Sequence, residues 1–179
     1  MLLLKATNLT WINGQPEDPT DQCAHGRIEL VVNGHVLYRT GEKDITVSAA
    51  CLYLLRTVED DHTPELSVAE GNWLFPCCGF NLFPEQGRYK VSCMGCNTGT
   101  DVFVRHLGDR VLLTYGEREA VVSQAEWRAA VLGLALQVEN FYAGCAPKAV
   151  LEDDFDIEGW RLFWSEWKAR KGRAERSVV

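Results

Sequence analysis

The 179-residue sequence contains no long hydrophobic run. A membrane-spanning helix needs about 18 or more consecutive apolar residues, and no segment reaches that length. The apolar start Leu2-Leu3-Leu4 is followed at once by Lys5. It has neither the basic leader nor the longer apolar region and small-residue cleavage site of a secretory signal. We therefore expect a cytoplasmic protein that has no membrane partner.

Common phosphate-binding and catalytic motifs are also missing. The sequence has no Gly-Lys-Ser/Thr phosphate loop, Gly-x-Gly-x-x-Gly, His-Glu-x-x-His or Gly-x-Ser-x-Gly. A zinc deaminase needs His-x-Glu and Pro-Cys-x-x-Cys, but Glu65 follows His62 one position too late and Pro76-Cys77-Cys78 has the wrong spacing. Since no segment brings a nucleophile, a base and an orienting group together, we expect a protein without enzymatic activity.

Basic residues are fewer than acidic ones, 18 against 25, which gives a net charge of −7. Such a charge repels a phosphate backbone, so nucleic acid is not expected to bind directly. The carboxylates are clustered, and clusters of this kind favour electrostatic docking of a basic protein. The predicted partner-binding residues are Asp153, Asp154, Asp156 and Glu158, followed by Glu59, Asp60 and Asp61.

The seven cysteines are an odd number and include an adjacent pair, which makes a poor disulfide framework. A structural zinc site needs four ligands, and Cys93 and Cys96 have a suitable spacing, with Cys78 as the third candidate. The fourth could be His62, His106 or Cys51. Buried, metal-free thiols are the alternative, because free cysteine is among the most buried residue types. We expect no cofactor, or a structural zinc ion at most.

The length and the 46% apolar composition suit one well-buried core, so residues 1–179 are expected to form a single domain. Asn33-Gly34 between two apolar segments predicts a hairpin over 27–39. Apolar spacing predicts a helix over 48–58, capped by Ser48 or slightly earlier. The segment 59–72 has no apolar periodicity and is predicted to be an exposed connection.

Further strands are predicted over 73–75, 89–92, 102–106, 111–115 and 119–122. Ser123 and Glu126 form a capping-box pattern that starts a long helix near 123–143. Aromatic spacing predicts a C-terminal helix near 157–170 whose aromatic face lies in the core, with frayed residues from about 171. The fold class is therefore predicted to be α+β, a mostly antiparallel sheet built from hairpins and covered by two or three helices.

Four segments resemble those of small single-domain bacterial immunity proteins, the partners of polymorphic and contact-dependent toxins. The segments are Cys23-Ala24-His25-Gly26, Val47-Ser48-Ala49-Ala50, Phe75-Pro76-Cys77-Cys78-Gly79 and 159–167. The resemblance implies a cytosolic, often acidic protein that binds one toxin domain tightly. Such a protein blocks the active site or substrate surface of the toxin and catalyses nothing.

Two other functions stay open at this point. The cysteine-rich turns could organise a zinc-stabilised interaction or regulatory module that has no toxin partner. An enzyme with an unrecognised cysteine or histidine site is the third alternative.

Overall fold

The computed structural model describes residues 1–69, 72–77, 81–84, 91–94 and 98–176. Its first sheet is antiparallel, and β2 pairs with each of the other three strands. These strands are β1 (Leu2–Thr10), β2 (His25–Val32), β3 (His35–Arg39) and β4 (Ile45–Thr46). Asn33 and Gly34 have φ values of 52° and 82°, as a type I′ turn requires. The predicted hairpin is confirmed.

The second sheet is a three-stranded antiparallel meander in the order β11, β10, β9. Its strands are β9 (Phe103–Leu107), β10 (Arg110–Tyr115) and β11 (Arg118–Ser123). Two short antiparallel pairs complete the described strands: β5 (Phe75–Pro76) with β8 (Gly99–Thr100), and β6 (Asn81–Pro84) with β7 (Val91–Met94). The α+β class with antiparallel hairpins is confirmed; of the strand predicted over 89–92, residues 91 and 92 lie in β7, and residues 89 and 90 lie outside the described residues.

The three helices are α1 (Val47–Arg56), α2 (Gln124–Gly144) and α3 (Asp154–Arg176). The capping box of α2 is present, with Ser123 and Glu126 each bonding the backbone of the other. The N-cap residue of α1 is Thr46, slightly before Ser48 as the prediction allowed, although the Thr46 side chain makes no capping hydrogen bond and Ser48 is buried inside the helix. Within the described ranges no helix is both long and apolar enough to span a membrane.

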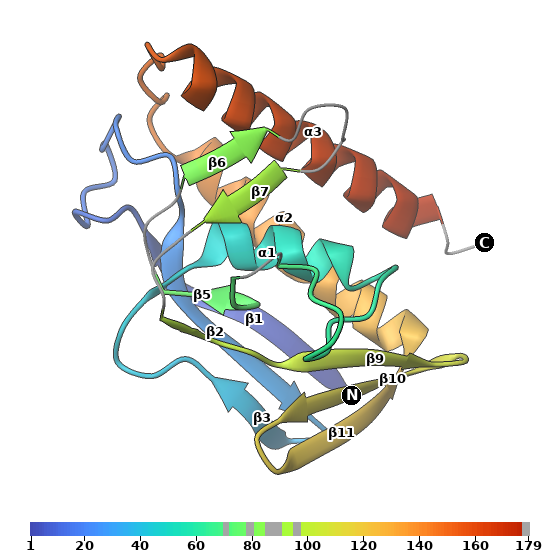
Figure 1. Cartoon of the computed structure of the whole chain (residues 1–179). Helices are drawn as coiled ribbons and strands as arrows, with labels where there is room; N and C mark the ends of the chain where they lie inside the picture. Colours follow the sequence, from blue (N-terminus) through green and yellow to red (C-terminus); the bar gives the residue numbers. More distant parts are fainter. Residues whose placement is uncertain (70–71, 78–80, 85–90, 95–97, 177–179) are drawn as a thin grey trace.

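Figure 1 shows the arrangement of these elements: the strands β1–β3 and β9–β11 lie on one side, α1 and α2 cross above them, and α3 is outermost beside β6 and β7. Phe163 and Trp167 of α3 are fully buried, so the aromatic face lies in the core as predicted. The helix continues to Arg176, and Ala174 in its last turns is buried. The predicted helix end near 170, with fraying from about 171, is therefore wrong for residues 171–176.

The segment after α1, predicted to be an exposed connection over 59–72, is exposed only in part, at residues 59, 60 and 64–67. His62, Thr63, Val68 and Ala69 are buried, and the backbones of His62 and Val104 exchange two hydrogen bonds of 2.8 Å. This segment packs against β9 without forming a regular element of its own, so it carries no apolar periodicity for sequence reasoning to detect.

Candidate functional site

The acidic run that precedes and starts α3 is exposed. A carboxylate oxygen of Asp153 accepts hydrogen bonds from the backbone N–H groups of Phe155 (2.8 Å) and Asp156 (3.3 Å), so Asp153 caps the helix. Asp154 and Asp156 lie in the first turn, where negative charge complements the helix dipole. Three of the four residues in the first predicted contact set therefore lie together on one helical turn.

The fourth residue, Glu158, is already paired within the chain. Arg161 donates two hydrogen bonds of 2.6 Å to its two carboxylate oxygens. These bonds hold the pKa of Glu158 below its usual value. Because both side chains of this pair are largely exposed, it stabilises the helix little, but it leaves Glu158 less available to a partner than Asp154 or Asp156.

Two partly exposed apolar residues alternate with these carboxylates along the first turn of α3, so the four side chains are distributed around the end of the helix. Phe155 is 44% exposed and Ile157 is 43% exposed. Exposed aromatic and aliphatic side chains rimmed by polar groups are typical of protein interaction surfaces. We call this region, Asp153, Asp154, Phe155, Asp156 and Ile157, the acidic–apolar surface.

A buried ion pair holds α3 in place further along the helix. Arg56 at the end of α1 donates two hydrogen bonds of 2.8 Å to the carboxylate of Glu166 in α3. Both side chains are almost completely inaccessible to solvent. The Arg56 guanidinium also donates to the carbonyl oxygens of Val68 and Val91, at 2.7 Å each. One arginine thus joins α1, the segment after it, β7 and α3.

Arg170 extends this network by donating to Glu166 at 2.9 Å. Burial raises the pKa of the Glu166 carboxyl, but the bonds from Arg56, the Val91 N–H and Arg170 outweigh burial, so the net shift is downward. An ionised, fully bonded Glu166 fixes α3 relative to α1 in one geometry. The acidic–apolar surface therefore sits on a rigidly anchored helix.

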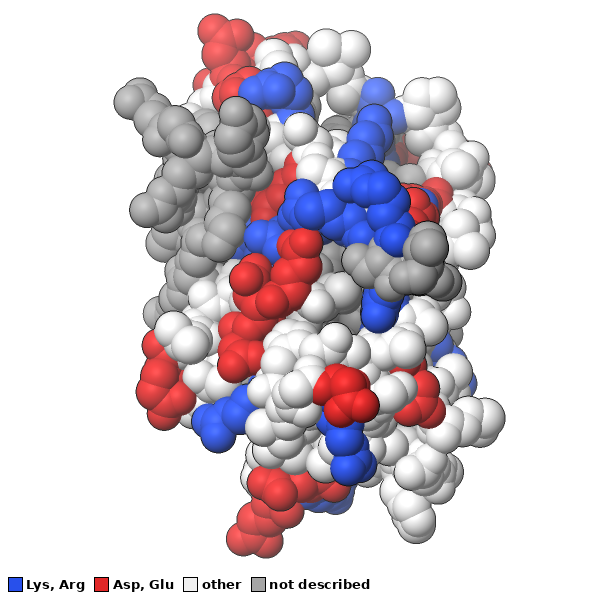
Figure 2. Space-filling model, turned by 90° about the vertical axis from the view of Figure 1, so that its right-hand side faces the viewer, with Lys and Arg blue, Asp and Glu red and all other residues white. Residues whose placement is uncertain are grey.

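The second predicted contact set, Glu59, Asp60 and Asp61, is occupied by internal contacts. Arg173 donates to Glu59 at 2.6 and 3.0 Å, and Arg170 donates to Glu59 at 2.9 Å and to Asp60 at 3.3 Å. The hydrogen bond from Arg173 is the main reason why the pKa of Glu59 is lowered. Figure 2 shows basic and acidic side chains lying against each other near the middle of the face nearest the end of α3.

Asp61 is bound to His106 of β9. Its carboxylate accepts a hydrogen bond from the His106 backbone N–H at 2.8 Å and lies 2.7 Å from the ring Nδ1. Burial raises the pKa of Asp61, but these two contacts outweigh it and the net shift is downward. The second set therefore holds the fold together at α3 and β9.

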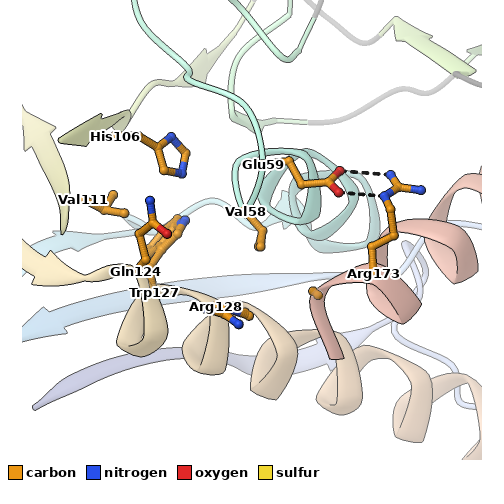
Figure 3. A pocket seen from close by; sticks show the side chains of 9 residues that line it. Val58, Glu59, His106, Val111, Gln124, Trp127, Arg128 and Arg173 are labelled. Carbon is orange, nitrogen blue, oxygen red and sulfur yellow. Dashed lines mark hydrogen bonds and ion pairs between the residues drawn. The ribbon is translucent and has the colours of Figure 1, made fainter. Parts of the chain in front are cut away.

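A small pocket of about 110 Å³ lies beside these contacts, where the end of α1, β9, α2 and α3 meet. In Figure 3 His106 lies on one side of it and the Glu59–Arg173 pair on the other. Gln124, Trp127 and Arg128 of α2 complete its polar and aromatic lining. The described lining holds no Ser, Thr, Cys or Lys. The His106–Asp61 pair thus has no nucleophile beside it within the described part of the pocket.

The predicted zinc ligands stay a prediction. Cys78 and Cys96 lie outside the described residues, and only the backbone of Cys93, in β7, is described. Among the side chains that are described, no group of three His, Cys, Asp or Glu residues could hold a metal ion.

The three candidates for the fourth ligand are placed in the described part of the chain. His62 is buried, with its Nε2 3.1 Å from Asp101 and its Nδ1 accepting from the Val68 N–H at 3.3 Å. His106 is held by Asp61, as described above. Cys51 is fully buried in α1, and burial raises the pKa of its thiol well above the usual value. Cys51 is therefore a buried thiol.

Sequence reasoning missed the buried charges of α3. Glu166 lies three residues after Phe163, and Arg170 lies three residues after Trp167, so both fall on the same helix face as the buried aromatics. Charged residues at positions of an apolar face are a signal that could have identified them. Nothing in the sequence indicated Arg56 as their partner.

Comparisons of the chain with protein-family models, with curated proteins and with solved structures found no match. The functional assignment therefore rests on the residues of this chain.

Proposed function

We propose that this chain is a stoichiometric protein inhibitor of the immunity-protein type, which binds and neutralises a cognate bacterial toxin in the cytoplasm. The observation that supports this proposal is the acidic–apolar surface, where Phe155 and Ile157 are exposed between carboxylates at the start of an anchored helix. The chain acts by binding and not by catalysis, and its partner is a basic toxin domain.

The two components of the surface have different roles in binding. Burial of Phe155 and Ile157 against a partner contributes affinity, about 1 kcal/mol for each side chain, because less than half of each is left to bury. The carboxylates Asp154 and Asp156 attract a basic protein over a distance and so raise the association rate. Because the Arg56–Glu166 pair already fixes α3, little conformational entropy is lost when the partner binds.

The experiment that tests this proposal is affinity capture from the source cells with the tagged chain, followed by expression of the captured protein. We expect one stoichiometric partner, basic in charge, that is toxic when expressed alone and harmless when this chain is expressed with it. High salt in the wash is expected to weaken the capture, because charges of the acidic–apolar surface are screened.

A matched pair of variants links the result to the surface. Asp154→Lys with Asp156→Lys reverses two exposed charges of the surface, and Glu42→Lys with Glu117→Lys makes the same change in net charge at two exposed positions elsewhere. We expect the first variant to lose protection and the second to protect as the wild type does. A captured protein that is not toxic, or protection that survives in both variants, contradicts the proposal.

A further inference from the structure

A groove of about 420 Å³ separates β3 from β11. Its apolar wall consists of Val32, Val36 and Leu37 from the first sheet, and of Ala120 and Val121 from the second. The volume falls within the range of about 300–1,000 Å³ that is usual for ligand sites. In Figure 1 β3 and β11 lie at the lower edge of the molecule and α3 at the upper edge. The groove is therefore separate from the acidic–apolar surface.

The β11 side of the groove is an unpaired strand edge. Within the described residues β11 pairs with β10 alone. The two-residue turn at Gly116 and Glu117 places Tyr115 opposite Arg118, and such a flanking pair exchanges backbone hydrogen bonds. Because these bonds alternate along an antiparallel strand, the next residue, Glu119, directs its N–H and C=O away from β10. Val121 does the same, and its side chain is 38% exposed.

The β3 side also presents backbone groups to the groove. In the described chain β3 pairs with β2 alone, and a bulge displaces the register between Leu30 and Val31 of β2. The carbonyl oxygens of Val36 and Leu37 both face Arg118, whose Nη1 lies 3.5 Å from each. Bonds of this length are weak, so these two carbonyls are acceptors that an incoming N–H could satisfy better.

The groove lining contains one arginine, Arg118, and one carboxylate, Glu119, and the part of the groove beside Arg118 suits a negative charge. The Arg118 side chain is exposed at the groove, and no carboxylate of the described residues forms an ion pair with it. A guanidinium binds a carboxylate through two parallel hydrogen bonds, more strongly than it binds a carbonyl. Charge complementarity therefore favours a chain segment that carries an acidic side chain.

From these observations we propose that the groove binds an extended peptide segment, which adds as a strand to the outer edge of β11. The segment hydrogen-bonds the backbone of Glu119 and Val121, places apolar side chains against Val36 and Leu37, and pairs an Asp or Glu side chain with Arg118. This mode of recognition uses main-chain bonds for affinity and side chains for specificity. It makes the groove a second binding site, independent of the proposed inhibitor function.

The test is a titration of the ¹⁵N-labelled full chain with synthetic peptides, followed by NMR. The probe is acetylated and amidated Thr-Val-Glu-Val-Thr, and its matched control has Gln in place of Glu. We expect saturable shifts of the backbone amides of Val36, Leu37, Glu119 and Val121. Loss of one exposed charge pair is worth up to about fivefold in affinity, so the Gln peptide should bind the wild type about two- to fivefold more weakly. The Gln and Glu peptides should bind the Arg118→Ala variant with equal affinity.

Strand addition itself is tested through the backbone. Val121→Pro removes the outward N–H without removing a bond to β10, and it should abolish binding, whereas Val121→Thr should retain it. If Val121→Pro does not fold, the main-chain bonds are tested in the wild type with the same peptide methylated on alternate amide nitrogens. This methylated peptide should not bind. Absence of saturable shifts at the groove, shifts confined to the acidic–apolar surface, or undiminished binding of the methylated peptide overturns the proposal.

Discussion

The acidic–apolar surface and the acidic segment 59–61 have the same charge in sequence but different environments in the fold. At the start of α3, Asp154 and Asp156 face solvent beside exposed apolar side chains. After α1, Glu59 is bonded to Arg170 and Arg173. The difference shows that an acidic run is available to a partner only where the fold brings no cations to it. The first region is the one that we propose for binding, and the second stabilises the fold.

The largest expected effect comes from breaking the network that joins these regions. Glu166→Ala leaves Arg56 charged, buried and without its carboxylate, which costs about 3–5 kcal/mol of unfolding free energy. Urea denaturation measures this loss. Glu158→Ala, which removes a solvent-exposed pair on the same helix, is the control and should unfold like the wild type. Equal effects of the two substitutions would contradict a buried, structural role for Glu166.

Two phenylalanines of α3 should differ in how much they contribute to stability. Phe163 is completely buried and Phe155 is 44% exposed. Phe163→Ala should destabilise the protein by about 3–5 kcal/mol through the cavity it creates. Phe155→Ala should destabilise the protein much less, by about 1 kcal/mol or less, because nearly half of the Phe155 side chain is already exposed. Thermal and urea unfolding check both values, and a strongly destabilised Phe155→Ala would mean that Phe155 belongs to the core.

The loss of stability on removal of a single carboxylate should also differ between the two acidic regions. Glu59→Ala deprives Arg170 and Arg173 of a shared partner, and since this ion pair is partly exposed and screened, the expected loss is about 1 kcal/mol. Asp156→Ala removes a carboxylate whose oxygens accept no described hydrogen bond and should reduce stability less. Urea midpoints of both variants in the same buffer make the comparison. The reverse order would contradict the division into a stabilising and a binding region.

Acid should remove the contribution of the stabilising region to the unfolding free energy. The pKa values of Glu59 and Glu166 are both lowered from the ordinary value of 4.5. Their contribution to stability is therefore fully present above that value and is lost as the pH falls through the lower folded-state values. Unfolding free energies measured between about pH 3 and 6 should decrease toward acid. Glu59→Gln should show a shallower decrease, and an unchanged slope would exclude Glu59 as a contributor.

Local rules predicted much of the fold. Asn33-Gly34 and the Ser123–Glu126 capping box each determine structure through bonds to residues next to them in sequence. The segment around His62 could not be predicted, because its backbone pairs with Val104, far away along the chain. No local pattern records such a contact.

The same distinction applies to the candidate site. The acidic residues at the start of α3 were identified because a cluster of carboxylates can be recognised in the sequence itself. The exposure of Phe155 and Ile157 depends on how α3 is rotated by its anchor at Glu166, which bonds to Arg56 of another helix. That rotation is a tertiary property. The internal pairing of Glu59 with Arg173 is hidden from sequence for the same reason.

The measurement that tests the central assignment most directly is the association rate of the captured toxin at low and at physiological salt. Asp154→Lys with Asp156→Lys should slow association and reduce its salt dependence, with the dissociation rate little changed. Glu42→Lys with Glu117→Lys should associate close to the wild-type rate. If the two variants slow association equally, net charge alone accounts for the effect, and the acidic–apolar surface is not the binding site.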